Sequence, residues 1–493
     1  MLVWDDLFPQ PWDSWRPGRD TARGFIPSQL NLIIPRLPRD DEITGVMADI
    51  FPFRGMIYNL EKVGDLSLVT APPYDVISEK SMDKYYLKHP YNVIRLELGD
   101  GPVLDRHRRC AHFFKQWEDQ GVLTREESPA FYFYQVNFPL NGSRKKVRKG
   151  FIGLCRLEEF GKGAILPHER IHEEQKEDRL KVLRACQANI SPIFSLYSDP
   201  KGFLCSLFEA HLTDPPLFDF MDEDQIRHSL WSIKDPSLLR AVREGMREKT
   251  LFIADGHHRY EAALAYKKEN EKAGDSSTGR GLFNSAMMYF CAFQDEGLTI
   301  LPSHRLLFNL SDFDRAGFEM KLQDYFRKTD YPFAPEDESK VRTRFLQALE
   351  EGQEGNVFGL YLHGSHRYTL LRLREGSNFS SMIGRNLPAV LRKLDVIILH
   401  RLIFEQLLGM EEKDQDQNRI RIIKNSTRAI DLVKEGRFQM VFLMNPPRVE
   451  EVQEVASEGE FMPQKSTFFY PKLPTGLVVS KLADDETIDD LIP

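Results

Sequence analysis

Hydrophobic and polar positions along the chain indicate strands and helices in alternation. Apolar runs predict strands over 66–70, 131–138, 281–293, 368–373 and 439–444. Apolar residues at helical spacing predict helices over 108–120, 173–188 and 395–408. No internal repeat is evident, so the pattern predicts a mixed α/β (α+β) fold, with mixed sheets and packed helices, rather than a solenoid.

The strongest local pattern lies between residues 250 and 269. A short apolar run ends in Asp255-Gly256, and helical spacing resumes from Arg259, which predicts a strand, a tight turn and a helix. Free backbone N–H groups at the positive N-terminal end of such a helix bind anions, and Gly256 lets the backbone approach a ligand closely. The pattern therefore predicts a phosphate site in a concave pocket.

The side chains of this turn supply the candidate chemistry. We expect Gly256, His257 and Arg259 to bind the phosphates of a nucleotide, because Arg259 offers a bidentate fork and His257 a hydrogen-bond donor. Asp255 and His258 are candidate catalytic residues, and Asp255 is also a candidate magnesium ligand. The alternative is an ordinary turn whose histidines are held structurally.

Charged residues also concentrate over 168–179. Glu169 and His168 are candidate general bases, and Arg170, Lys176 and Arg179 are candidates for a clamp on a phosphorylated group. The alternative is a solvated helix with i,i+3 and i,i+4 ion pairs. Because both clusters are rich in anion-binding groups, we predict that this one approaches the phosphate turn in space.

The same segment contains a possible zinc motif. His168-Glu169-Arg170-Ile171-His172 matches the pattern in which two histidines one helical turn apart bind the metal. The match follows Pro167, carries charged Arg170 and Glu173 where a buried zinc helix needs uncharged residues, and lacks an evident third ligand downstream. A metallopeptidase is therefore a remote alternative.

The length of 493 residues exceeds one average domain. We expect an irregular N-terminal extension over 1–45, an α/β region over 46–200, a second α/β region over 201–480 that contains the turn, and a tail over 481–493. Two further segments are expected to be structural. The basic run over 144–149 is interpreted as a solvated strand face, and the Pro-rich segment over 462–474 as packing across the core. The alternative for the second segment is that Lys465, with the hydroxyls of Ser466 and Thr467, closes over an anion.

Net charge and composition limit the classes of partner that the chain is expected to bind. With 66 Lys and Arg against 74 Asp and Glu the net charge is −8, which makes nonspecific binding to nucleic acid unexpected. No apolar stretch approaches the ~20 residues of a membrane span, and the N-terminus lacks the pattern of a secretory signal. The five cysteines form no CxxC pair. These features favour a cytoplasmic protein with a small phosphorylated ligand and no membrane partner.

Several short motifs occur in a characteristic order. They are Pro52-Phe53-Arg54-Gly55, Ala71-Pro72-Pro73-Tyr74-Asp75-Val76-Ile77, His89-Pro90-Tyr91-Asn92, Lys176-Glu177-Asp178-Arg179 and Ile253-Ala254-Asp255-Gly256-His257-His258-Arg259-Tyr260-Glu261. Together they resemble the domain of unknown function 1015 family, from about residue 50 to 480. Membership in this family implies no particular reaction.

The Asp-Gly-His-His-Arg element is also similar to the phosphate-binding turn of the ParB and sulfiredoxin superfamily. Its members include nucleotide-binding DNA partition switches, sulfinic-acid reductases and free-serine kinases. The resemblance covers a small part of the chain and implies nucleotide-phosphate contacts for Gly256 and Arg259, with Asp255, His257 and His258 matching the kinase-like version. No basic helix-turn-helix is evident and no cysteine adjoins the turn, which argues against the first two roles.

These features favour a nucleotide-dependent phosphoryl-transfer enzyme, either a small-molecule kinase or a phosphatase, acting on a hydroxyl-bearing amino acid or its phosphate. The expected cofactor is a nucleoside triphosphate or diphosphate with magnesium. Tyr74, Asp75 and Arg54 are candidate residues of a substrate loop. The alternative is a non-catalytic nucleotide or phosphometabolite sensor that uses the same turn.

Overall fold

The computed structural model describes residues 48–99, 105–140, 144–272, 280–311, 313–375, 382–384, 386–411, 419–482 and 486–492. These residues form two compact units. The inserted unit is Thr299–Tyr470, and the main unit comprises the described residues up to Leu298 and from Pro471 onward. The extension predicted over 1–45 lies outside the described residues.

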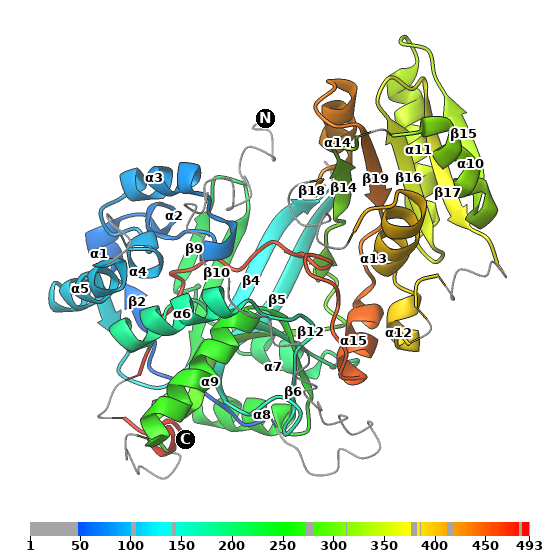
Figure 1. Ribbon diagram of the computed structural model, residues 1–493. Coiled ribbons are helices and arrows are strands. Elements are labelled where there is room, and N and C mark those ends of the chain that lie inside the picture. Colours follow the sequence, from blue (N-terminus) through cyan, green and yellow to red (C-terminus); the bar gives the residue numbers. More distant parts are fainter. Residues whose placement is uncertain are drawn as a thin grey trace, which may run out of the picture. The chain divides into compact units, whose positions relative to one another are not determined.

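The described part of the main unit is built on a nine-stranded mixed sheet (Figure 1). Its strands lie in the order β6 (Ile165–Leu166), β11 (Leu251–Asp255), β8 (Ile193–Tyr197), β12 (Ser285–Ala292), β5 (Arg144–Arg156), β4 (Phe131–Leu140), β10 (Arg227–Ile233) and β9 (Phe218–Met221), and β1 (Ile50–Phe51) pairs with β5. The domain boundary predicted from the sequence at residue 200 is wrong, because it divides this sheet. β8, before the boundary, pairs antiparallel with β11 and parallel with β12, which both follow it.

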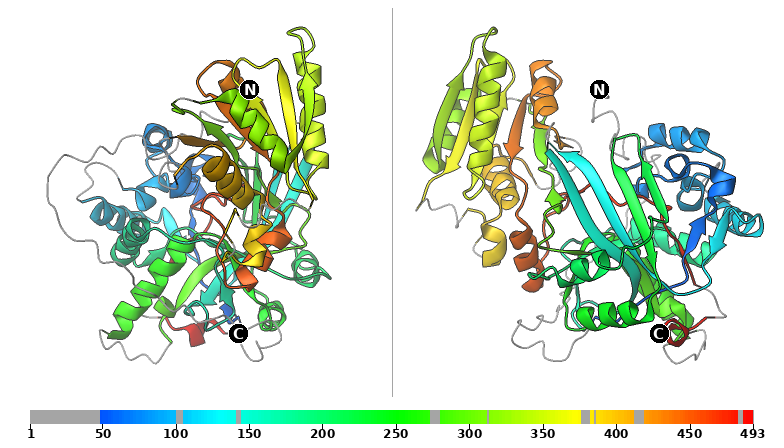
Figure 2. Two further views of the ribbon diagram at one scale, coloured as in Figure 1. Left: turned by 45° about the vertical axis from the view of Figure 1, so that its right-hand side comes forward. Right: turned by 180° about the vertical axis from the view of Figure 1, so that it is seen from behind.

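Helices cover both faces of this sheet (Figures 1 and 2). α6 (Glu173–Cys186) and α9 (His257–Lys272) pack against each other on one face, and α7 (Phe203–Glu209) and α8 (Pro236–Met246) lie on the other. Every residue of β8 is buried, as expected for a strand covered on both sides. The other main-unit elements are β2 (Met56–Tyr58), α1 (Leu60–Val63), α2 (Leu66–Val69), η2 (Tyr74–Val76), α3 (Glu79–Lys88), α4 (Ile94–Glu97), α5 (Arg106–Asp119), β3 (Leu123–Arg125), β7 (Ala188–Asn189) and η4 (Leu282–Asn284).

The chain returns to the main unit after Pro471. Thr475 forms a β-bridge with Ala71, and β21 (Ser480–Lys481) pairs with β7. Leu473 is buried, so this end of the Pro-rich segment packs into the core as predicted. Within the tail expected over 481–493, η8 (Ile488–Leu491) buries Ile488.

The inserted unit contains a six-stranded sheet. Its strands lie in the order β15 (Phe326–Pro332), β17 (Arg367–Leu373), β16 (Val357–Leu362), β19 (Met440–Met444), β14 (His304–Leu307) and β18 (Ile420–Ile423). Its helices are α10 (Arg315–Tyr325), α11 (Glu338–Glu351), α12 (Ala389–Arg392), α13 (Asp395–Ile397), the π-helix η6 (Ile398–Leu407), α14 (Ser426–Lys434) and α15 (Val449–Ser457). β13 (Thr299–Ile300) pairs with β20 (Phe469–Tyr470), which joins the two ends of this unit.

Most elements predicted from hydrophobic spacing are confirmed, including β4, β17, β19, α5 and α6. The strand predicted over 66–70 is wrong, because Leu66–Val69 is the short helix α2. Asp65 caps it by accepting a hydrogen bond from the Ser67 N–H at 2.8 Å, and the Thr70 hydroxyl donates to the Leu66 carbonyl at 2.9 Å. These local side-chain hydrogen bonds override the apolar pattern.

The basic run over 144–149 differs from its predicted solvated face at one position. Lys145 is exposed, but Arg148 is 0% exposed. Neighbouring residues of a strand point to opposite faces, so a run of consecutive basic residues in a sheet that is covered on both sides must turn some of them inward. The fold as a whole is mixed α/β, as predicted.

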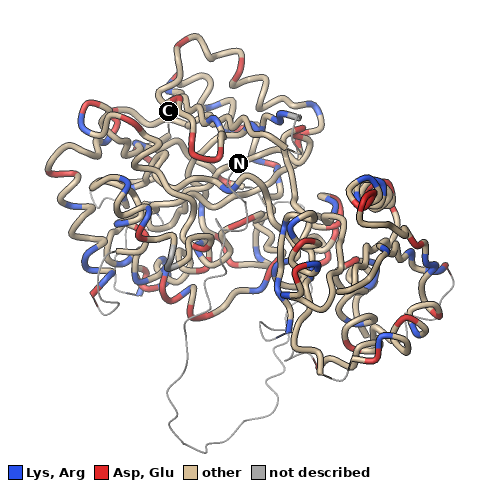
Figure 3. Tube along the Cα trace, turned by 90° about the horizontal axis from the view of Figure 1, so that it is seen from above, with Lys and Arg blue, Asp and Glu red and all other residues tan. Residues whose placement is uncertain are grey.

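Basic and acidic residues are mixed along the traces of both units (Figure 3). None of the helices in the described part of the chain has both the length and the apolar composition that crossing a bilayer would require.

Candidate functional site

The β11–α9 turn has the strand, turn and helix geometry that the sequence predicts. Gly256 adopts φ +94°, a conformation that residues with a side chain rarely accept. A Cβ atom at Gly256 would also lie 2.9 Å from Nε and Nη2 of Arg259. The backbone conformation therefore favours glycine here, and a side chain at this position would displace the Arg259 guanidinium.

The first turn of α9 presents its backbone donors freely. The Tyr260 N–H donates to the Gly256 carbonyl at 3.0 Å and begins the helical hydrogen bonds. No residue in the described part of the chain accepts a hydrogen bond from the backbone N–H groups of residues 256–259. Four such donors at the positive end of a 16-residue helix form an anion-binding geometry.

Arg259 lies beside these donors and is partly engaged. Its Nη2 donates to Oδ2 of Asp255 at 2.8 Å, and its Nη1 donates to the Pro192 carbonyl at 2.6 Å. Its Nε atom is buried, and none of the described residues accepts a hydrogen bond from it. The Nε–H donor of the guanidinium is thus left for a ligand without breaking either bond.

Lys472 is the residue of this site that sequence reasoning missed. Its ammonium donates to Oδ1 of Asp255. Burial acts to raise the pKa of Asp255, but the charges of Lys472 and Arg259 outweigh it and lower that pKa to about 2. The sequence around Lys472 is a Pro-rich segment without catalytic spacing, so nothing local connects it to the turn.

A second carboxylate of the site belongs to η2. The Asp75 side chain is exposed. Its pKa is nevertheless raised, first because the packed residues around it reduce its solvation and second because of the negative charge of Asp255. The neighbouring Tyr74 ring lies under the Arg179 guanidinium, with 3.9 Å between Cζ and the ring centroid. Tyr74 and Asp75, the predicted substrate loop, therefore lie at the site. Arg54 is instead paired with the buried Glu486 carboxylate.

Histidine contacts join the second predicted cluster to the turn. The His168 N–H donates to Nε2 of His257 at 3.3 Å, and the His172 N–H donates to Nε2 of His258 at 2.9 Å. The predicted approach of these segments, which are more than 80 positions apart in sequence, is therefore confirmed. Because each Nε2 accepts a hydrogen bond, the side chains of His257 and His258 hold the segment in place.

All three buried or half-buried histidines of the cluster are poor bases. Burial lowers the pKa of His168 to about 4. Burial and the neighbouring His172 together lower the pKa of His258 to about 4. Burial and then His168 lower the pKa of His257 well below its usual value. The imidazoles are therefore neutral at pH 7 and serve as hydrogen-bonding groups.

The residues predicted to clamp phosphate lie in different environments. Arg179 is buried and donates through Nη1 to Oε2 of Glu97 at 2.5 Å, and its Nη2 donates to Asp178. Lys176 is paired with Glu173 at 2.9 Å on the same helix. Arg170 is exposed and Glu169 is half-buried, directly after His168. The solvated helix with i,i+3 ion pairs thus accounts for Lys176, whereas Arg179 is buried and pairs with Glu97, 82 positions away.

The zinc-peptidase alternative is wrong. His168 and His172 do not lie on one helix, because α6 begins only at Glu173. Nδ1 of His168 donates to the Ile253 carbonyl at 2.6 Å. Within the part of the chain that the structure describes, no group of three or more His, Cys, Asp or Glu side chains is arranged to hold a metal ion.

Asp255 does not fit the predicted role of a magnesium ligand in this arrangement. Its two carboxylate oxygens accept from Lys472 and Arg259 respectively, and two cations beside a carboxylate disfavour a third. The chain's own cations therefore occupy the position that the metal was expected to take.

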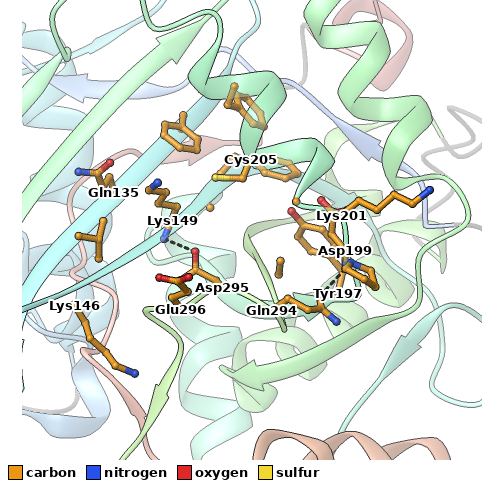
Figure 4. A pocket seen from close by; sticks show the side chains of 18 of the residues that line it. Gln135, Lys146, Lys149, Tyr197, Asp199, Lys201, Cys205, Gln294, Asp295 and Glu296 are labelled. Carbon is orange, nitrogen blue, oxygen red and sulfur yellow. Dashed lines mark hydrogen bonds between the residues drawn. The ribbon is translucent and has the colours of Figure 1, made fainter.

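The predicted concave pocket at the turn stays a prediction, but a cavity of about 890 Å³ lies elsewhere in the main unit (Figure 4). It is on the α7 side of the sheet, between β5 and the loops that follow β8 and β12. Asp295, Glu296 and Lys149 line its centre, while the Lys201 side chain extends away from it. None of the candidate site residues predicted from the sequence lines this cavity, although Lys145, Lys146 and Lys149 of the basic run do.

The family of the chain follows from comparison with known families. The family described as Protein of unknown function (DUF1015) matches residues 50–397, which is more than half of the chain. The chain belongs to this family, as its motifs predict. A search of curated proteins found no match.

Several solved structures are similar over part of the fold. A conserved hypothetical protein from Pyrococcus furiosus is 15% identical, with 66% of this chain and 94% of that chain covered and a TM-score of 0.28. A free serine kinase in complex with AMP is 13% identical, with 66% and 90% covered and a TM-score of 0.29. SbnI with a C-terminal truncation, from Staphylococcus aureus, is 13% identical, with 66% and 89% covered and a TM-score of 0.31. TM-scores this low carry no argument about this chain, and the ParB and sulfiredoxin resemblance of the turn stays a prediction.

Proposed function

We propose that the chain binds the phosphate groups of a nucleotide at the β11–α9 turn and transfers a phosphoryl group to or from a small hydroxyl-bearing molecule, such as a hydroxyl amino acid. One observation carries the proposal. The backbone N–H groups of residues 256–259 lack an acceptor among the described residues, at the N-terminus of a long helix and beside Arg259 and Lys472.

The charges of the site suit a phosphate that arrives from outside. Lys472 and Arg259 are both held by one carboxylate, Asp255. A phosphate group takes hydrogen bonds from the backbone donors and from Nε of Arg259, and its negative charge competes with Asp255 for the two cations. Phosphoryl transfer depends mainly on such positioning and charge neutralisation.

Two carboxylates are candidates for the base that accepts the proton of the substrate hydroxyl. Glu169 follows His168, whose backbone N–H donates a hydrogen bond to the side chain of His257, the first residue of α9. Asp75 has a raised pKa and remains exposed beside Asp255. Asp255 is unsuited to this role, because its low pKa makes it a weak base.

One observation favours a second candidate function, a sensor of a nucleotide or phosphometabolite. Lys472 lies on the segment that follows the inserted unit. A ligand that draws Lys472 away from Asp255 therefore changes a contact of that segment. Such differential binding is sufficient to shift a conformational equilibrium without any chemical step.

The test is a nucleotide panel with the full-length chain. ATP, ADP, AMP and GTP are added with magnesium or with EDTA, and thermal stabilisation is measured beside release of phosphate and nucleoside diphosphate, with free hydroxyl amino acids as acceptors. Stabilisation with turnover supports the enzyme, and stabilisation without turnover supports the sensor. Absence of stabilisation by every nucleotide contradicts both.

A further inference from the structure

Arg148 lies on β5 within the sheet of the main unit, on the face opposite the cavity. Phe151, three residues further along β5, packs against Phe208 of α7, so alternation along the strand directs Arg148 to the α9 face. The side chain is completely buried. The guanidinium of an arginine carries a positive charge and offers only hydrogen-bond donors.

No described residue accepts a hydrogen bond from Nε, Nη1 or Nη2 of Arg148. The guanidinium lies against two aromatic rings, with its Cζ 4.9 Å from the centroid of Phe194 and 5.7 Å from that of Tyr289. The Tyr289 hydroxyl is also buried, and apart from its interaction with the Cys291 thiol it has no hydrogen-bond partner among the described residues. The cluster therefore combines four hydrogen-bonding atoms with no acceptor for the charge.

The nearby acidic group does not supply that acceptor. The carboxylate of Asp295 interacts electrostatically with Arg148 without a direct hydrogen bond. It instead accepts hydrogen bonds from the backbone N–H groups of Gly297 at 2.9 Å and Lys149 at 3.3 Å. Attraction between a cation and aromatic faces recovers only part of the cost of removing a guanidinium from water. Buried polar groups in native proteins nearly always have a hydrogen-bond partner, and the strongest partner for a guanidinium is an anion.

We propose that Arg148 anchors a second ligand site, which takes the carboxylate group of a small molecule. Aromatic rings flank the guanidinium, so the directions left to a ligand lie near the guanidinium plane. A planar carboxylate matches this shape through a bidentate pair, whereas a tetrahedral phosphate does not. The guanidinium is fully covered in this structure, so binding of a carboxylate requires a movement of the residues that cover it.

Phe194 also connects this site to the phosphate turn. In the sheet it is the register partner of Asp255 on β11 and of Tyr289 on β12, and neighbouring strands lie about 4.8 Å apart. Pro192, two residues before Phe194, accepts a hydrogen bond from Arg259. Occupation of the Arg148 site is therefore expected to affect the turn, although the evidence for the two sites is independent.

The test measures thermal unfolding of the full-length chain in sodium acetate and sodium glycerate, with sodium chloride at matched ionic strength and inorganic phosphate as a separate arm. The parent chain is expected to be stabilised by the carboxylates. Arg148→Met is expected to weaken that effect at least roughly tenfold in apparent affinity, as loss of a charge-assisted pair requires. In chloride alone it is expected to be at least as stable as the parent, because an apolar side chain of similar volume replaces an unpaired buried charge.

Two variants control this result. Lys201→Met removes an exposed positive charge on the opposite face and is expected to leave the carboxylate effect unchanged. Arg259→Ala is expected to lose stabilisation by phosphate and to keep stabilisation by carboxylates, which separates this site from the proposed function. If Arg148→Met does not fold, Tyr289→Phe, which deletes only the hydroxyl, is expected to weaken the carboxylate effect. A carboxylate effect that is absent from the parent, or equal in parent and variant, overturns the proposal.

Discussion

The ammonium of Lys472 contacts the carboxylate of Asp255 directly, although 217 positions separate the two residues in the sequence. Both side chains are about 15% exposed. The contact brings a cation from the C-terminal segment to the N-terminus of α9, where Arg259 already lies against the same carboxylate. The candidate site is therefore complete only when the chain has returned from the inserted unit.

Replacement of Lys472 by methionine is expected to destabilise the fold. Asp255 keeps Arg259 as a partner but loses one charge-assisted hydrogen bond in a mostly buried position. This loss costs about 1.5 to 3 kcal/mol, and urea unfolding at pH 7 measures it. Lys481→Met is the matched control, because Lys481 lies on the same segment and pairs with Glu118 at 2.5 Å in a more exposed position. That control is expected to change the unfolding free energy by less than about 1 kcal/mol. If both substitutions lower the unfolding free energy equally, the contact between Lys472 and Asp255 contributes no more to stability than an exposed ion pair.

Arg259→Ala and Glu169→Gln are expected to fail in different ways. Loss of a charge-assisted hydrogen bond to phosphate costs about 1.5 to 3 kcal/mol, which is roughly one to two decades in nucleotide affinity. A base acts mainly in the transition state, so its amide leaves ground-state affinity intact and lowers turnover by ~100-fold or more. Calorimetric binding and single-turnover phosphate release distinguish the two.

Asp75→Asn completes this comparison, since Asp75 is the other candidate base. If Glu169→Gln keeps full turnover while Asp75→Asn loses it, the base is Asp75. If Arg259→Ala binds nucleotide as tightly as the parent chain, the phosphate site lies elsewhere.

Arg179 is expected to act on stability rather than on ligand affinity. Its guanidinium is occupied by Glu97 and Asp178, and Glu97 is itself buried. Arg179→Met leaves that carboxylate without its cation and is expected to cost about 3 to 5 kcal/mol, measured by denaturant unfolding. Lys176→Met, which breaks only the exposed pair with Glu173, is expected to cost less than about 1 kcal/mol. Nucleotide affinity that falls tenfold in folded Arg179→Met would restore its predicted role as a clamp.

The buried His168 is expected to make the fold sensitive to mild acid. Its folded pKa of about 4 lies below its unfolded value of about 6.5, so between these values the unfolded chain binds more protons. Stability therefore falls as the pH decreases from about 6.5 to 4, by on the order of 2 kcal/mol between pH 6.5 and 5 from this residue alone. Urea unfolding from pH 7 to 5 measures the slope.

His168→Asn is expected to reduce that slope, because its amide N–H replaces the Nδ1–H donor to Ile253 without titrating. His211→Asn is the control, since His211 is exposed and its Nδ1 makes a comparable bond to the Leu207 carbonyl. An unchanged slope in His168→Asn would assign the acid sensitivity to other groups.

Local patterns in the sequence determined much of the fold and the centre of the site. The break at Asp255-Gly256 between two periodicities fixed the strand, turn and helix, because backbone preferences and helix capping act over a few residues. Five ordered motifs likewise established the family. Only α2 among the elements compared was assigned to the wrong class, where hydrogen bonds of Asp65 and Thr70 prevailed over hydrophobicity.

Tertiary structure alone decided which charges remain available. The sequence predicted the same phosphate-binding role for Arg179 and Arg259. The Arg179 guanidinium is held by Glu97, 82 positions away, whereas Arg259 keeps its buried Nε donor beside the turn. Arg148 was expected in solvent and is buried between two rings from other strands. Burial and ion pairing depend on contacts between residues distant in the chain, and periodicity contains no record of those contacts. The sequence therefore determined where the free backbone donors of the turn lie, and the folded chain decided which side chains accompany them.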